Sequence, residues 1–143
     1  MSTERIIVQR AVLEKFRRVL VETAEKVFEK DAPPPILIAG GAVDKNKSLV
    51  ANALAKGANI LFGDLNSRET YKASMRPLIV ENVTPEMEVY FTESFGPTVS
   101  LMAVDTEAEA IALANDTEYG LSAAIYTENL FRAIRLGREL ECG

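Results

Sequence analysis

The segment FTESFGP (91–97) places one carboxylate, Glu93, between two aromatic residues, Phe91 and Phe95. A carboxylate accepts hydrogen bonds well from the two hydroxyls of a sugar diol, as an acid does on the ribose in dinucleotide-binding folds. Phe95 would then provide an apolar wall beside the same ligand. The alternative interpretation is a solvated surface acid near two core residues, because most carboxylates in proteins are exposed.

Other groups with chemical reactivity are scarce in this chain. It contains no histidine, which excludes Ser-His and Cys-His catalysis, His-ligated zinc and the usual proton shuttle near neutral pH. Cys142 is the one thiol and lies between Glu141 and the C-terminal residue, whereas reactive thiolates prefer positive neighbours or a helix N-terminus. We expect Cys142 to be a bystander. A single cysteine also excludes an intrachain disulfide, which is typical of a reducing compartment.

Three further stretches have the composition of a ligand site, and for each we favour a structural role. Gly40 and Gly41 precede a helical pattern without the spacing of either common phosphate-binding motif, so we predict a tight strand-to-helix turn. Asp64 and Glu69 share a polar loop, and we expect solvation there, since Ca²⁺ requires about six or more oxygens. Gly120 is expected to supply an unusual φ between a helix and a strand. We expect no metal site.

Composition indicates one globular domain. The chain has 143 residues, of which 48 % are apolar and 26 % are charged, an ordinary mixture for a single soluble domain. The formal net charge of −5 disfavours nucleic acid as a partner, because counterion release from phosphates would not drive binding. No apolar run approaches the roughly 20 residues that span a bilayer, and the N-terminal residues lack the order of a signal peptide. We therefore expect no membrane association and a cytoplasmic location.

Strand and helix patterns alternate along the chain. Short apolar runs predict strands at 5–9, 36–39, 59–62, 98–104 and 121–126, with an extended run at 75–83. Apolar residues at helical spacing predict helices over 12–28, over 44–57, from 106 through 114, and over 130–140. This alternation predicts the α/β class, with an open, mostly parallel twisted sheet and helical crossovers.

Local signals fix several of the predicted boundaries. Asp44 is expected to cap the second helix, whose core face comprises Leu49, Val50, Ala53 and Leu54, and Gly57 to end it. Thr106 and Glu109 have the spacing of a capping box, in which each side chain bonds the other's backbone N–H.

Several segments together resemble one known family. ESFGP (93–97) resembles the E-x-F-G-P segment of the aldehyde dehydrogenases, and ANDTEYGLSAAIYT (114–127) resembles their N-x-T-x-Y-G-L-x-A stretch. Upstream, ALAKGANILFG (53–63) and RPLIVENVTPEMEVYFTE (76–93) are similar to the segments that precede those motifs, and STERIIV (2–8) looks like the strand after the catalytic cysteine. The resemblance covers nearly the whole chain, with the last helix extending to its end, and the order of the two C-terminal motifs is specific.

The resemblance implies an NAD(P)-dependent oxidoreductase that converts an aldehyde to a carboxylic acid through a cysteine thiohemiacetal and a thioester. Glu93 would hold the nicotinamide ribose hydroxyls, shielded by Phe91 and Phe95, and Phe95 would pack near the nicotinamide. Gly96 and Pro97 would fix the turn. The implied partners are a small-molecule aldehyde, NAD or NADP, and further copies in a homo-oligomer. A sister enzyme that passes its acyl group to a thiol remains an alternative.

The same resemblance implies that the chain is one part of such an enzyme. The nucleophilic cysteine of the family lies five residues before the arginine matched by Arg5, so we expect it directly ahead of Met1, which would line the substrate tunnel. Residues 1–143 would then form a single α/β segment, the C-terminal part of the catalytic domain, without the nucleophile, the cofactor domain or any catalytic residue. We expect this segment to be inactive alone, to bind NAD(P) weakly and to expose apolar surface. The alternative is a self-contained, non-catalytic α/β module that binds a ligand or partner. The sequence of residues 27–41 departs from the commoner family pattern, so the resemblance does not identify which aldehyde is the substrate.

Overall fold

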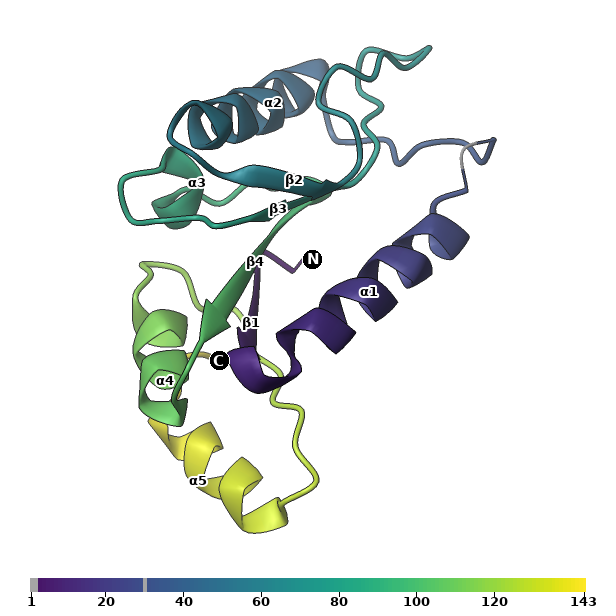
Figure 1. The fold of residues 1–143 in the computed structure, drawn as a ribbon. Helices are drawn as coiled ribbons and strands as arrows, with labels where there is room; N and C mark the ends of the chain where they lie inside the picture. Colours follow the sequence, from purple (N-terminus) through teal and green to yellow (C-terminus); the bar gives the residue numbers. More distant parts are fainter. Residues whose placement is uncertain (1–2, 30) are drawn as a thin grey trace.

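A twisted sheet forms the centre of the molecule (Figure 1). The computed structural model describes residues 3–29 and 31–143, and among these residues four strands pair in the order β1-β4-β3-β2. The strands are β1 Arg5–Gln9, β2 Asn59–Phe62, β3 Leu78–Glu81 and β4 Thr98–Val104. β4 pairs in parallel with both β1 and β3, while β2 joins β3 in the antiparallel sense. The expected open, mostly parallel α/β sheet is confirmed.

The register brings the start of β1, β3 and β4 to one edge of the sheet. Arg5 lies opposite Ser100, and Leu78 lies opposite Thr98. The backbone N–H of Ser100 donates to the carbonyl of Glu4 at 2.9 Å, so the pairing continues one residue before β1. Because parallel strands run in the same direction, the residues that lead into β1 and those that lead into β4 lie at the same edge.

The described part of the chain forms five helices: α1 Arg10–Val27, α2 Gly40–Ala55, α3 Glu88–Phe91, α4 Glu107–Asn115 and α5 Leu130–Glu139. Of these, α1, α2 and α4 pack on the sheet. α1 and α4 lie on opposite sides of β1 and β4 (Figure 1). The strand β3 is buried on both faces, because Leu78 and Val80 join a cluster under α2 while Ile79 joins a second cluster under α1. A strand covered on both faces explains the continuous apolar run that predicted it.

The predicted boundary signals at α2 and α4 are largely confirmed. Gly57 ends α2 with a φ of +102°, a left-handed conformation that favours glycine. The hydroxyl of Thr106 accepts from the N–H of Glu109 at 3.1 Å, and the Glu109 carboxylate accepts from the N–H of Thr106, so the capping box is present. The expected core face of α2 is buried at Leu49, Val50 and Ala53.

The predicted strand at 36–39 is wrong. These residues form one isolated bridge, between Ile36 and Ser74, and Ile38 is 98 % exposed. Three prolines directly before this run remove consecutive backbone donors, so no ladder extends there. α2 begins at Gly40 with Ala39 as its N-cap, so Asp44 lies inside the helix and is not its cap. Gly40 and Gly41 are consequently the first turn of α2 and not a turn after a strand.

The predicted strand at 121–126 is also wrong, since these residues run in irregular conformation with no described strand beside them. An apolar run becomes a strand only where a neighbouring backbone satisfies its N–H and C=O groups. Gly120 has no positive φ; its role is a close approach, because a Cβ there would lie 2.9 Å from the carbonyl oxygen of Glu141. The last helix ends at Glu139 and does not reach the end of the chain.

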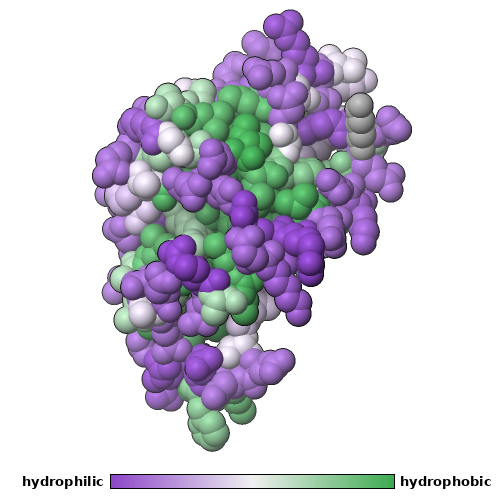
Figure 2. All heavy atoms as spheres, in the orientation of Figure 1, coloured by the Kyte–Doolittle hydropathy of each residue, from purple (hydrophilic) through white to green (hydrophobic). Residues whose placement is uncertain are grey.

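Part of the apolar surface of the helices faces solvent. α1 directs Leu13, Leu20 and Ala24 into the core but leaves other apolar positions of the expected stripe exposed, and α5 exposes its apolar face. The exposed apolar residues on these helices are Val12, Phe16, Val19, Val27, Leu130, Phe131 and Ile134. Figure 2 shows apolar side chains across the middle of one face and again at the end where α5 lies. None of the helices formed by the described residues is long and apolar enough to cross a membrane.

Candidate functional site

Glu93 lies in a turn that connects α3 to β4, at the edge of the sheet where the parallel strands begin. Its side chain is half-buried and makes no hydrogen bond or ion pair with the described residues. The shielding expected from two rings is not found in this part of the chain, because Phe91 is 48 % and Phe95 71 % exposed. Phe91 instead packs edge-on against Tyr90, with ring centroids 4.6 Å apart. Glu93 is therefore an acceptor without an internal partner, next to an exposed aromatic ring.

The backbone of this turn is strained at Phe95, whose φ is +49°. The left-handed region costs a residue with a Cβ roughly 1–2 kcal/mol, so the surrounding contacts must hold it. Ser94, which is 1 % exposed, lies directly before the strained position, and its hydroxyl accepts from the N–H of Gly96 at 3.2 Å. The carbonyl of Pro97 accepts from the N–H of Leu78 at 2.8 Å and anchors the end of the turn to β3.

Glu4 holds the turn from the N-terminal side of β1. Its carboxylate accepts from the N–H of Ser94 at 3.2 Å, from the hydroxyl of Ser94 at 3.0 Å and from the N–H of Phe95 at 3.3 Å. Two successive backbone N–H groups directed at one anion form a nest that favours negative charge. Sequence reasoning missed Glu4, because nothing in a polar residue before a strand signals a contact 90 residues away.

Asn46, on α2, holds the same turn from the opposite side. The amide is fully buried, and its Nδ2 donates to the carbonyl of Ala42 at 2.8 Å and to that of Ser94 at 2.9 Å. A Cβ on Gly96 would lie 2.4 Å from Nδ2 of Asn46. The glycine of the ESFGP segment is thus required by this close approach and not by its φ. Asn46 was predicted neither as a core residue nor as a site residue, since a polar residue within a helical pattern is usually solvated.

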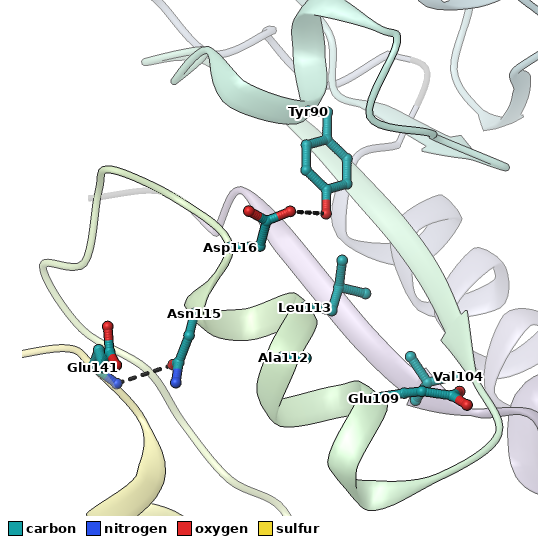
Figure 3. Close-up of a pocket in the computed structure, with 8 residues that line it drawn as sticks. All are labelled: Tyr90, Val104, Glu109, Ala112, Leu113, Asn115, Asp116 and Glu141. Atoms are coloured by element: carbon teal, nitrogen blue, oxygen red, sulfur yellow. Dashed lines mark hydrogen bonds between the residues drawn. The ribbon is translucent and has the colours of Figure 1, made fainter.

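Arg5 ties the start of β1 to α3 and to the end of α4. Its guanidinium donates to the carbonyls of Leu113 at 2.8 Å, Asp116 at 2.9 Å and Tyr90, and its Cζ lies 4.7 Å from the centre of the Tyr90 ring. The hydroxyl of Tyr90 donates to Oδ2 of Asp116 at 2.6 Å (Figure 3). Burial, followed by this hydrogen bond, raises the pKa of Tyr90 to about 12, and the Arg5 charge opposes the rise.

A hollow of about 660 Å³ in the described surface lies beside this network (Figure 3). It is lined by Tyr90, Val104, Glu109, Ala112, Leu113, Asn115, Asp116 and Glu141. Most of its polar side chains are occupied within the fold: Tyr90 bonds Asp116, Glu109 caps α4, and Asn115 bonds the backbone of Glu139 and Glu141. Glu93 and Phe95 are not among its lining residues. We therefore locate the candidate site at the turn and not in this hollow.

The remaining residues considered from the sequence lie apart from the turn. Asp64 accepts from the N–H of Asn66 at 2.9 Å, whereas Glu69 pairs with Arg76 at 3.3 Å, so the two acids are engaged separately. Residues 3–29 and 31–143 contain no group of three or more side chains suited to hold a metal ion. Cys142 is exposed. Met1, expected to flank a nucleophile, and Ser2 lie outside the described residues.

Comparison with known proteins identifies the relatives of this chain. A family model described as "Aldehyde dehydrogenase family" matches residues 1–143. A vanillin dehydrogenase from Pseudomonas sp. (strain HR199 / DSM 7063) is 37 % identical over 149 residues, covering 100 % of this chain and 30 % of that protein. The chain thus spans about a third or less of the length of the curated relatives that it matches.

Solved structures agree in fold and have cofactors bound. A succinic semialdehyde dehydrogenase from Streptococcus pyogenes, in complex with NADP⁺, is 25 % identical with a TM-score of 0.87, over 98 % of this chain and 32 % of that one. A betaine aldehyde dehydrogenase from Staphylococcus aureus, in complex with NAD⁺, is 30 % identical with a TM-score of 0.85, over 98 % of this chain and 29 % of that one. Both cofactors are therefore used among proteins of this fold.

Proposed function

Because the chain belongs to the aldehyde dehydrogenase family, we propose that it forms part of the catalytic domain of an enzyme that oxidises an aldehyde to a carboxylic acid with NAD⁺ or NADP⁺. By "the whole protein" we mean this chain together with the further length that its relatives have. In this proposal residues 1–143 supply the sheet edge and the turn that carries Glu93, while the nucleophilic cysteine directly precedes Met1 and the cofactor domain lies elsewhere in the whole protein.

One observation carries the proposal most strongly: the start of β1 and the Glu93 turn meet at one edge of the sheet. Glu4 contacts both Ser94 and Phe95 directly, so the chain leading into β1 touches the strained residue of the turn and the residue before it. An aldehyde oxidised by hydride transfer must lie between its nucleophile and the nicotinamide. A nucleophile next to β1 and a cofactor held by Glu93 satisfy this requirement.

The residues of the turn fit the sugar and ring of a nicotinamide dinucleotide. Glu93 has no partner among the described residues, so both carboxylate oxygens are available to accept from the two ribose hydroxyls. The exposed ring of Phe95 offers an apolar surface beside that carboxylate. When bound, the cofactor supplies the hydride acceptor. The residues of this chain orient it: Glu93 fixes the ribose, Phe95 excludes water from one side, and Glu4 with Asn46 keeps the turn in place.

The substrate class is an aldehyde that forms a thiohemiacetal with the cysteine. Attack by the thiolate on the carbonyl carbon forms a carbon–sulfur bond, and loss of hydride from that carbon leaves a thioester, from which water releases the acid. Similar proteins carry the names vanillin dehydrogenase and betaine aldehyde dehydrogenase, one aldehyde aromatic and the other aliphatic and cationic.

The whole protein provides the direct test. We expect an aldehyde-dependent rise in reduced nicotinamide absorbance with NAD⁺ or NADP⁺, and complete loss of that rise on replacement of the residue before Met1 by alanine. Failure of a panel of aromatic and aliphatic aldehydes to give any turnover with either cofactor would overturn the proposal.

The 143-residue chain provides the complementary test. We expect no turnover from it and negligible NAD⁺ binding in calorimetry, because most contacts to the cofactor belong to the rest of the whole protein. Turnover that survives Cys142→Ala would rule out the expectation that this chain is inactive alone. Tight binding of NAD⁺ would favour the self-contained, non-catalytic module.

A further inference from the structure

We propose that Glu4 is a positioning residue, which sets the location of Glu93 and Phe95 relative to the start of β1. This inference rests on the proposed function, since it assigns to Glu4 a part in cofactor placement. Glu4 itself contacts neither substrate nor cofactor in this account. It acts through the turn that it binds.

The backbone of Glu4 is held on the sheet independently of its side chain. Its carbonyl accepts from the N–H of Ser100 at 2.9 Å, which extends the pairing of β1 with β4. The next residue, Arg5, is anchored through its guanidinium to carbonyls of α3 and of the end of α4. A side chain on this rigid stretch of backbone can hold a neighbouring segment at a defined place.

The carboxylate of Glu4 is matched to the donors of the turn. Three donors converge on it within 3.0–3.3 Å, namely the N–H and hydroxyl of Ser94 and the N–H of Phe95. Hydrogen bonds to an ionised acceptor are stronger than neutral ones, and they can offset the strain of the left-handed backbone at Phe95. An uncharged or shorter side chain would leave part of this nest without an acceptor.

Asn46 completes the arrangement from the other side of Ser94. Its amide donates to the Ser94 carbonyl, so Ser94 is held at its N–H, its hydroxyl and its carbonyl at once. Glu93 and Phe95 are the residues on either side of Ser94. Without Glu4 the turn keeps the Asn46 contact, the bond from Leu78 to the Pro97 carbonyl and the approach of Lys45 to the Phe95 ring, but it loses its contact with the start of β1. We therefore expect Glu93 to move relative to β1.

The experiment measures steady-state kinetics of the whole protein with three variants: Glu4→Gln, Glu93→Gln and the double variant. Glu4→Gln keeps the size of the side chain but replaces one acceptor oxygen by a donor amide. We expect the KM for the nicotinamide cofactor to rise about tenfold, with a smaller change in the KM for the aldehyde. Glu25→Gln, an exposed acid on α1, is the matched control and leaves both constants unchanged.

The double variant separates positioning from a general structural role. If Glu4 acts through Glu93, Glu4→Gln adds little once Glu93 is already replaced, because interacting residues are not additive. Ser94→Ala, which removes only the hydroxyl donor, gives a smaller change in the same direction and serves where Glu4→Gln does not fold. Additive effects of Glu4→Gln and Glu93→Gln would overturn the inference. So would an unchanged cofactor KM in folded Glu4→Gln and Ser94→Ala proteins. In either case, activity of the wild type would still support the proposed function. An inactive wild type would overturn the proposed function and the inference with it.

Discussion

At the scale of single residues, the turn before β4 shows why each residue of the ESFGP segment has its type. Ser94 is small enough to be buried and polar enough to use its N–H, hydroxyl and carbonyl together. Gly96 leaves room for the Asn46 amide. Pro97 directly precedes β4, and its carbonyl accepts a hydrogen bond from Leu78 at the start of β3. The carboxylate of Glu93 has no hydrogen-bond partner among the described residues, so it remains available to bind a ligand.

Gly96→Ala tests the close approach of the turn to α2. The new Cβ would meet the Asn46 side chain at 2.4 Å and displace an amide that bonds two carbonyls. We expect the free energy of unfolding to fall by about 1–3 kcal/mol in urea denaturation. Gly137→Ala is the control, since a Cβ there meets nothing within 4 Å, and it raises stability by about 0.5–1 kcal/mol through helix propensity. Equal stability of Gly96→Ala and the wild type would contradict this packing.

Tyr90 gives a prediction for the pH dependence of stability. Its pKa is raised from 10.0 to about 12 by burial and by the bond to Asp116, so the folded state holds the phenolic proton where the unfolded state has lost it. The protonated Tyr90 phenol therefore contributes fully to the free energy of unfolding below about pH 10, and this contribution is lost as the pH rises toward 12. The loss amounts to at most about 2–3 kcal/mol. Urea unfolding across this window should show a steeper loss for the wild type than for Tyr90→Phe. Tyr126→Phe, at an exposed position, should keep the wild-type slope, and a wild-type slope in Tyr90→Phe would refute the assignment.

At the scale of elements, local patterns succeeded where the partners of an element lie within the described chain. The strands at 5–9, 59–62 and 98–104 were predicted with the observed bounds, and β4 lies between two partners. The runs at 36–39 and 121–126 have similar composition but no ladder beside them, and both are irregular. Composition records a preference for extended backbone, whereas pairing depends on tertiary context.

In the candidate site, too, local sequence pointed to one residue but could not predict the residues that contact its turn through the tertiary fold. Glu93 stands out in the sequence because its neighbours are unusual for a carboxylate. Glu4 and Asn46 do not, because their roles come from contacts across 90 and 48 residues. The glycine and proline after Glu93 predicted a fixed turn, but the sequence could not show what fixes it.

The capping box of α4 gives a prediction for an element boundary. Thr106→Ala removes the hydroxyl that accepts from the Glu109 N–H, and we expect a loss of about 1 kcal/mol in the free energy of unfolding. Thr23→Ala, at an exposed position of α1, is the control and should remain within about 0.5 kcal/mol of the wild type. Similar stabilities for the two variants in urea denaturation would mean that the cap contributes little.

At the scale of the whole molecule, apolar helix faces reach solvent while most residues of β3 and β4 are buried. Phe131 on α5 is 85 % exposed, next to Leu130 and Ile134, which are also exposed. Exposed apolar groups of this kind mark surfaces that associate with other surfaces. We expect the 143-residue chain to self-associate, with a weight-average sedimentation coefficient that rises with concentration, and Phe131→Glu to reduce the rise. A single monomer boundary over a wide concentration range would contradict this expectation.

The measurement that tests the central claim most directly is the kinetic effect of Glu93→Gln in the whole protein. If Glu93 accepts from the ribose hydroxyls of the nicotinamide, this variant lowers kcat or raises the cofactor KM by about tenfold or more while the unfolding midpoint stays at the wild-type value. Glu118→Gln, at an exposed acid away from the turn, leaves both constants unchanged. Wild-type kcat and wild-type cofactor KM in a fully folded Glu93→Gln protein would contradict the account.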